Sequence, residues 1–184
     1  MDVRKRMCNC SGTTLMELLT SLAIVAIIAT LAAPSFRTLQ LDGRRTAVVN
    51  GFLHALFLAR SEAIKRGRVV TVCRSGDGRH CDYGAADWSI GWMVFVNNDR
   101  DDPPVRDARE DVIAHSGAWP GGSITSNRRA YSFRPMAQAV VNGTIVFCDS
   151  RGSAHARAII ISHTGRPRVA QRDADGKPLR CPPG

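Results

Sequence analysis

The sequence predicts an α+β fold in which one long N-terminal helix packs on an antiparallel β-sheet. From Phe36 to Ile64, apolar residues recur at spacings of three and four, which is the period of a helix that buries one face. After Gly67 come short runs rich in β-branched and aromatic residues, separated by Gly, Pro, Asn and Asp as strands are. A single helix followed only by strands indicates an antiparallel sheet that covers the apolar face of the helix.

The expected strands follow one another without an internal repeat or a second domain. They cover residues 69–74, 89–97, 111–115, 130–134, 143–148 and 156–163. A length of 184 residues and a hydrophobic content of 44% suffice to bury one core. The formal net charge of +9 is spread unevenly along the chain, and this unevenness bears on function.

The first half of the helix is apolar enough to enter a membrane. The stretch Leu15–Phe36 is long enough at helical rise to cross a bilayer of roughly 30 Å. Its one carboxylate is Glu17, and residues 4–6 before it are all cationic. Positive charge before a span holds that end in the cytoplasm, so we expect everything after about residue 40 to lie outside.

The residues around Glu17 resemble the class III signal of type IV prepilins and pseudopilins. The matching segment reads Ser11-Gly12-Thr13-Thr14-Leu15-Met16-Glu17-Leu18-Leu19. In that family a membrane peptidase cuts after the glycine and methylates the new N-terminal amine, which implies cleavage between Gly12 and Thr13. The family glutamate pairs with the amine of a neighbouring subunit during assembly, and Glu17 stands at its position. Thr13 departs from the family, which usually has phenylalanine there.

This resemblance implies a single-pass protein of the inner membrane with a cytoplasmic N-terminus. Its globular domain would be periplasmic and later extracellular on the pilus. The expected organisation is a removed leader (1–12), a membrane-spanning helix (13–36), its amphipathic continuation (37–67), a β-sheet domain (68–164) and a basic C-terminal tail (165–184).

Four of the six cysteines lie outside the leader, at positions 73, 81, 148 and 181. An even number outside the membrane indicates two disulfides, for which three pairings are possible. Cys73 and Cys81 flank a Gly-Asp-Gly turn and are easily bridged, which leaves Cys148 to tie the tail at Cys181. A zinc site is the alternative, but these spacings fit no zinc finger or ribbon.

The sequence lacks the motifs of common enzymes. It contains no G-x-S-x-G, no phosphate-binding G-x-x-x-x-G-K and no H-E-x-x-H, and its five histidines are scattered singly. The acidic segment 97–102 lacks the central glycine and terminal glutamate of a calcium loop, so we expect a solvated loop there. We therefore expect no catalysis, no metal and no cofactor.

Residues 151–180 carry seven cationic side chains against two aspartates. Within them, Gly165 permits a tight turn and Pro167 stiffens an extended segment, so Arg166 and Arg168 point the same way. Two residues of strand rise span about 6.5–7 Å, which is close to the spacing of successive phosphates on one nucleic-acid strand. The residues expected to widen this contact are Arg172, Lys177, Arg180 and Arg157. Composition alone favours the alternative of a solvated basic tail.

The whole chain is similar to the FimT/GspH family of type IV pilin-like proteins, and among them to FimT-type minor pilins. The matching features are the class III leader, the long helix, a Val-Thr-Val-Cys-Arg-Ser strand, a Gly-Trp-x-Val-Phe strand, a Gly-Thr-x-x-x-Cys strand and a final Gly-Arg-x-Arg. Gly165, Arg166 and Arg168 resemble the motif by which FimT-type pilins bind DNA during natural transformation. Type II secretion pseudopilins share the helix and the sheet without this motif.

The resemblance implies a minor type IV pilin that binds double-stranded DNA without sequence preference for uptake. The implied partners are double-stranded DNA, the other pilins of the fibre, the prepilin peptidase and the inner membrane. One alternative is a structural minor pilin or GspH-like pseudopilin that acts only in fibre assembly. A second alternative is a surface adhesin whose basic face meets acidic polysaccharide or anionic lipid.

Overall fold

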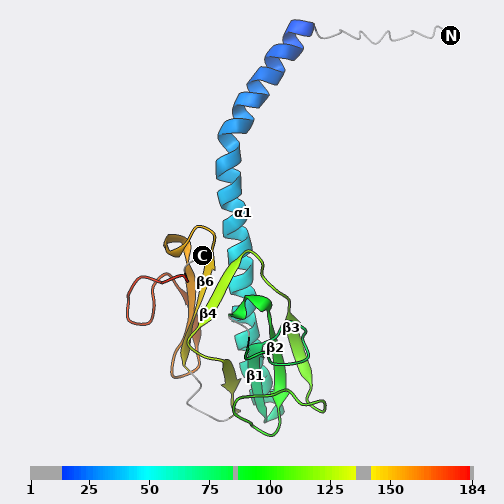
Figure 1. The fold of residues 1–184 in the computed structure, drawn as a ribbon, viewed down its shortest axis with the longest axis vertical. Coiled ribbons are helices and arrows are strands. Elements are labelled where there is room, and N and C mark those ends of the chain that lie inside the picture. Colours follow the sequence, from blue (N-terminus) through cyan, green and yellow to red (C-terminus); the bar gives the residue numbers. More distant parts are fainter. Residues whose placement is uncertain (1–13, 85–86, 136–141, 183–184) are drawn as a thin grey trace, which may run out of the picture. The chain divides into compact units, whose positions relative to one another are not determined.

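A computed structural model describes residues 14–84, 87–135 and 142–182 (Figure 1). One helix precedes all the strands, as predicted. The elements are α1 (Leu15–Arg66), β1 (Val69–Arg74), β2 (Trp92–Asn97), β3 (Val112–Ser116), β4 (Gly122–Ser126), β5 (Ala130–Phe133), β6 (Gly143–Asp149), β7 (Arg157–Ile161) and β8 (Pro167–Ala170), with short 3-10 helices at Trp88–Ile90 and Ser153–His155. The chain divides into two compact units, Met1–Leu41 and Asp42–Gly184.

The described part of the first unit is the N-terminal portion of α1. Thr14 precedes the helix, and its Oγ1 accepts a hydrogen bond from the Glu17 backbone N–H at 3.3 Å, which caps the helix start. The hydroxyls of Thr20 and Ser21 donate to the Glu17 carbonyl, so these polar groups are satisfied within the helix. Among the described residues, α1 alone is long and apolar enough to cross a membrane, properties that N-terminal signal sequences share. The expected leader and its cleavage site at Gly12 and Thr13 lie outside the described residues.

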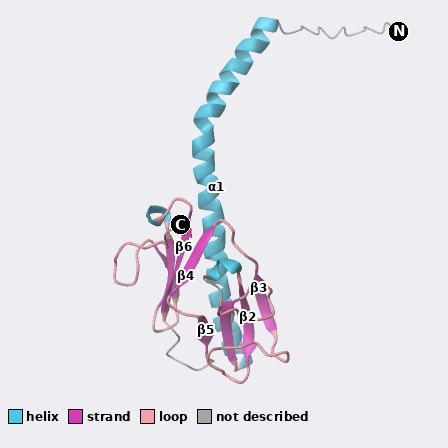
Figure 2. Cartoon of the chain, in the orientation of Figure 1, coloured by secondary structure: helices cyan, strands magenta, loops and turns pink. Residues whose placement is uncertain are grey.

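The second unit contains two antiparallel sheets, where a single sheet was expected (Figure 2). The β1 sheet has the order β3-β2-β1-β5, and the β6 sheet has the order β4-β6-β7-β8. Strands β4 and β8 were not predicted, and β8 lies inside the segment 165–184 that was expected to be a tail. Residues 88–90 form a 3-10 helix instead of the start of β2, because the Asp87 carboxylate accepts a hydrogen bond from the Ser89 N–H at 2.7 Å.

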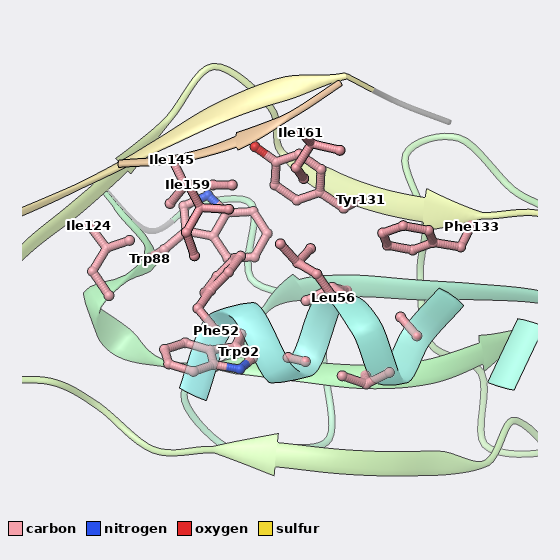
Figure 3. Close-up of a cluster of buried hydrophobic side chains, with 14 of the residues drawn as sticks. Phe52, Leu56, Trp88, Trp92, Ile124, Tyr131, Phe133, Ile145, Ile159 and Ile161 are labelled. Atoms are coloured by element: carbon pink, nitrogen blue, oxygen red, sulfur yellow. The ribbon is translucent and has the colours of Figure 1, made fainter. Parts of the chain in front are cut away.

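The core of this unit lies between α1 and the inner faces of the two sheets (Figure 3). One face of the helix is fully buried, at spacings of four, three and four residues: Phe52, Leu56, Ala59 and Ala63. The Phe52 ring lies 5.4 Å from that of Trp88, 4.9 Å from that of Trp92 and 5.9 Å from that of Phe147. Trp92 belongs to the β1 sheet and Phe147 to the β6 sheet, so Phe52 joins both sheets to the helix.

A cluster of ion pairs fixes the helix against the end of β6. The side chain of Arg45, 4% exposed, contacts Asp42 at 2.8 Å and Asp149 at 3.5 Å, and donates to the His155 carbonyl at 2.5 Å. Arg151 contacts the same two carboxylates, Asp149 at 2.6 Å and Asp42 at 2.8 Å. The two arginines and two aspartates balance in charge, and their mutual attraction offsets part of the cost of taking these groups out of water.

Close packing at the start of β4 gives a first testable prediction. A Cβ atom on Gly122 would lie 1.9 Å from the carbonyl oxygen of Cys148, which belongs to the neighbouring strand of the β4–β6 ladder. Gly122→Ala should therefore push β4 from β6 and lower the free energy of unfolding by about 1–3 kcal/mol, the usual cost of overpacking. Urea denaturation measures this change. Gly117→Ala is the control because a Cβ there meets nothing within 4 Å, and equal stability of the two variants would contradict the prediction.

Candidate nucleic-acid interface

The candidate site is built on the hairpin of β7 and β8. The two strands pair from Ala158 opposite Ala170 to Ile161 opposite Pro167. The turn between them closes through a hydrogen bond from the Gly165 N–H to the Ser162 carbonyl at 2.8 Å. Gly165 has a φ of 71°, which residues other than glycine rarely adopt, so the tight turn predicted at this glycine is present.

Arg166 directly precedes β8 and Arg168 is its second residue, and both are exposed. Arg168 is opposite Ile160, which alternates with the core residues Ile159 and Ile161 along β7. The Arg168 side chain therefore leaves from the outer face of the β6 sheet. Within the described residues, neither guanidinium has an ion pair or a hydrogen bond, so both are free to contact a ligand.

The C-terminal residues fold back over the same outer face. The Cys148–Cys181 disulfide ties the tail to β6, and the neighbouring Leu179 is buried in a small cluster with Ala158. The second disulfide, Cys73–Cys81, closes the loop that follows β1, so the structure contains the pairing favoured from the sequence. The tail is therefore a packed segment held against β6 and β7, and Figure 1 shows it as the red loop.

This packing brings Arg172 next to Arg168. Both line an open pocket of about 410 Å³, together with Asp173. The Arg172 guanidinium donates to the Gly176 carbonyl at 3.1 Å, which orients it. One carboxylate oxygen of Asp173 accepts the backbone N–H groups of Asp175 and Lys177, at 2.9 and 2.8 Å. Asp173 therefore shapes the tail loop without pairing to either arginine.

Two of the other expected cations lie near this pocket. Lys177 and Arg180 are exposed and line the adjoining pocket, to which Asp173 also contributes. They extend the positive charge of the tail beyond Arg172.

Arg157 does not join this surface. It is opposite Phe147 in the β6–β7 ladder and shares the inner face of the sheet with Ile159, at the other end of β7 from the partner of Arg168. Its guanidinium donates to the Ala156 carbonyl at 3.0 Å. Arg157 thus lies on the opposite face of the β6 sheet from Arg168 and at the end of β7 farthest from the hairpin turn, so we propose the interface without it.

The structure adds one cation that the sequence analysis missed. Arg60 of α1 donates from Nη1 to the Thr164 carbonyl at 3.0 Å, inside the β7–β8 turn. The helical period places Arg60 beside the buried Ala59, but it gives no sign that the turn lies within reach. We call Arg60, Arg166, Arg168 and Arg172 the hairpin surface. It joins cations from the helix, the turn, the edge strand and the tail.

The remaining expectations concern metals and the acidic loop. Among the described residues, no group of three or more His, Cys, Asp or Glu side chains is placed to hold a metal ion. The segment 97–102 is largely exposed, as expected, except for Asn97, which ends β2 and is buried. Its amide donates to Asp101 at 2.9 Å and its side-chain oxygen accepts the Arg100 N–H at 2.6 Å, so the loop is organised around this side chain.

Comparison with known proteins shows which part of the chain matches a protein family. The model of the family described as type II transport protein GspH matches residues 48–165. This match ends before Arg166, so three of the four arginines of the hairpin surface lie outside it. No curated protein matches the chain.

Three solved structures are similar to the chain. Two are crystal forms of the type IV minor pilin FimU from Pseudomonas aeruginosa, both 15% identical. The P65 form has a TM-score of 0.52, and the match covers 74% of this chain and 98% of the FimU chain. The P21 form has a TM-score of 0.50, with coverage of 79% and 96%. The minor pseudopilin EpsH of the type 2 secretion system of Vibrio cholerae is 13% identical, with a TM-score of 0.48 and coverage of 69% and 96%.

Proposed function

Because the chain belongs to the GspH family and is a minor pilin or pseudopilin, we propose that it is a minor type IV pilin that binds double-stranded DNA for uptake in natural transformation. The observation that carries this proposal is the pair of exposed arginines at the start of β8, whose guanidinium groups have no partner among the described residues. A guanidinium presents a planar fork of N–H donors that matches phosphate oxygens.

The surroundings of the pair favour a linear polyanion as the ligand. Arg172 shares a pocket with Arg168, and Arg60 reaches the turn that precedes Arg166. Arg168 leaves from the outer face of the β6 sheet, whereas Arg60 belongs to α1, which packs on the inner face, so these cations extend around the hairpin instead of converging on one point. Contacts to phosphates carry no base information, and binding should therefore be independent of DNA sequence.

The N-terminal residues support a role in a fibre. We propose that the prepilin peptidase cleaves between Gly12 and Thr13 and methylates Thr13, and that Glu17 pairs with the new amine of a neighbouring pilin. Neutralising two charges in lipid is the physical reason for a carboxylate at this position. On this proposal, α1 anchors the protein in the inner membrane with its N-terminus in the cytoplasm, and the second unit is periplasmic and then extracellular on the pilus.

Titration with DNA tests the proposed ligand. The full chain in a non-ionic detergent is titrated against a labelled random duplex at two salt concentrations, and fluorescence anisotropy gives the affinity. If about three to five phosphates are neutralised, log K should fall against log salt with a slope of roughly −3 to −4.5. Arg166→Gln/Arg168→Gln should weaken binding at least about tenfold and reduce the magnitude of that slope by about 2.

The control for this test removes the same charge elsewhere. Arg79 and Arg109 are exposed and have no side-chain partner within the described residues, so Arg79→Gln/Arg109→Gln matches the double variant in charge and chemistry. Equal loss in both variants, or no binding by the wild-type chain, would overturn the proposal. Heparin that competes better than DNA would instead indicate an adhesin for acidic polysaccharide.

A second candidate function rests on the family match. The match is to a type II transport protein and ends at residue 165, so the shared part of the chain excludes Arg166 and Arg168. A structural minor pilin or pseudopilin that acts only in fibre assembly would need none of these arginines. If Arg166→Gln/Arg168→Gln binds DNA as tightly as the wild-type chain does, this second function is the one that the result supports.

A further inference from the structure

A second group of arginines lines a cavity beside β5. This strand is at the edge of the β1 sheet (Figure 2). The cavity has a volume of about 410 Å³. Arg129 and Arg134 flank β5 on either side and Arg100 comes from the loop after β2; all three line the cavity. We infer that this cavity binds a phosphate group, carried either by a small phosphate or by the backbone of a nucleic acid.

The three arginines lack partners of their own. Within the described residues, the side chains of Arg100, Arg129 and Arg134 form no ion pair and no hydrogen bond. Arg128, which lines the same cavity, instead donates to the carbonyl and to the side-chain oxygen of Asn142, both at 2.9 Å. Like charges around one cavity repel each other, and a bound anion would relieve that repulsion.

Two aspartates also line the cavity without neutralising the arginines. The carboxylate of Asp101 accepts hydrogen bonds from the Asn97 amide at 2.9 Å and from the Val105 N–H at 2.7 Å, so it is committed to its own loop. Asp102 is exposed and forms no ion pair in the described structure. With four arginines against two aspartates, the lining keeps an excess of positive charge.

The backbone around the cavity holds the arginines in place. Arg100 has a φ of 62°, a conformation that costs free energy for a residue with a side chain. Its N–H donates to the side-chain oxygen of Asn97 at 2.6 Å, and Asn97 is itself buried. Arg129 and Arg134 adjoin a strand that is paired to β1 along its length. The positions of all three Cα atoms are therefore set before any ligand arrives.

The number of arginines favours phosphate over a carboxylate. A carboxylate offers two oxygens, which serve two guanidinium forks, whereas a phosphate offers three or four acceptors to three forks. The cavity is separate from the hairpin surface because its lining strand β5 belongs to the β1 sheet and the hairpin to the β6 sheet. The inference therefore does not rest on the proposed function.

Calorimetry with inorganic phosphate tests the inference. The full chain in non-ionic detergent is titrated with phosphate at constant ionic strength, and the Arg129→Gln/Arg134→Gln variant should bind at least about tenfold more weakly, since each hydrogen bond to a charged group contributes roughly that factor. Arg79→Gln/Arg109→Gln should bind as the wild type does. No binding by the wild-type chain, or equal weakening in both variants, would overturn the inference.

A second variant keeps the test informative if the arginine variant is unstable. Asp102→Asn removes the unpaired carboxylate of the cavity and should tighten phosphate binding several-fold, whereas Asp107→Asn, outside the lining, should not. Unchanged affinity in Asp102→Asn would contradict the site. Duplex DNA then distinguishes the two sources: weaker DNA binding by Arg129→Gln/Arg134→Gln supports a nucleic-acid backbone, and weaker binding of inorganic phosphate alone supports a small phosphate.

Discussion

Replacing Phe52 by alanine should lower the free energy of unfolding by about 3–5 kcal/mol, the usual cost of removing a buried phenylalanine. The Phe52 ring is fully buried and packs against Trp88, Trp92 and Phe147, which come from both sheets and the connection between β1 and β2. Its loss therefore leaves a cavity that neither sheet can fill by moving alone. Denaturant unfolding followed by tryptophan fluorescence measures the change.

The same helix provides a matched control for this substitution. Phe57 is 50% exposed, so Phe57→Ala removes the same atoms without opening a buried cavity. It should cost less than about 1 kcal/mol. If Phe52→Ala and Phe57→Ala destabilise the domain equally, the ring of Phe52 does not join the sheets in the way described.

The second large effect is expected at Asp149. Both Arg45 and Arg151 form ion pairs with Asp149. In Asp149→Asn, Asp42 is the one carboxylate that still pairs with these two guanidinium groups among the described residues. Removing one partner of a buried ion pair costs about 3–5 kcal/mol, and because Asp42 remains, we expect a loss of about 3 kcal/mol. Chemical denaturation measures it. Asp175→Asn is the control because Asp175 is exposed, and it should change stability little.

This cluster also predicts how stability depends on pH. Burial raises the pKa of Asp149, but the hydrogen bonds and charge of Arg151 and the charge of Arg45 outweigh it and lower the pKa overall. The hydrogen bond from Arg151 likewise lowers the pKa of Asp42. A lowered folded-state pKa stabilises the protein above the unfolded value of about 3.9, and this stability is lost as the pH falls through the folded value.

Acid titration of the wild-type chain and of Asp149→Asn checks this linkage. The melting temperature of the wild-type chain should fall as the pH drops from about 5 towards 2, and in the variant the fall should be shallower because one of the responsible carboxylates is gone. It should not vanish, since hydrogen bonds from His80 lower the pKa of Asp77 as well. Parallel curves for the two proteins would show that Asp149 contributes nothing to acid sensitivity.

The helix and most strands could be predicted because their patterns are local. The spacing of Phe52, Leu56 and Ala59 shows a buried helical face, and runs such as Val69–Arg74 contain the residues that strands favour. Strand β4 was missed because Gly122–Ser126 has a single large apolar residue, and β8 was missed because Arg-Pro-Arg suggests a tail. The division into two sheets depends on pairing between distant segments, which the pattern of one strand does not reveal.

The candidate sites likewise combine features that follow from a local sequence pattern with features that depend on long-range folding. Gly165 and the two arginines after it form a local motif, so the turn and its free cations could be predicted. The contact of Arg60 with Thr164 joins residues 104 positions apart, and no sequence pattern near either residue predicts it. Arg157 was grouped with the tail cations because its place on the inner face follows from strand register. The cavity lined by Arg100 depends on the same long-range folding.

The path of the chain between the sheets has a thermodynamic consequence. Strands β1, β2, β3 and β5 belong to one sheet, and β4, β6, β7 and β8 belong to the other. The chain therefore crosses between the sheets before β4, again before β5 and a third time before β6. Neither sheet is a continuous stretch of sequence, and both share α1 as their core partner. Opening one sheet exposes the apolar face on which the other depends, so half-folded species are disfavoured and the domain folds and unfolds as one cooperative unit.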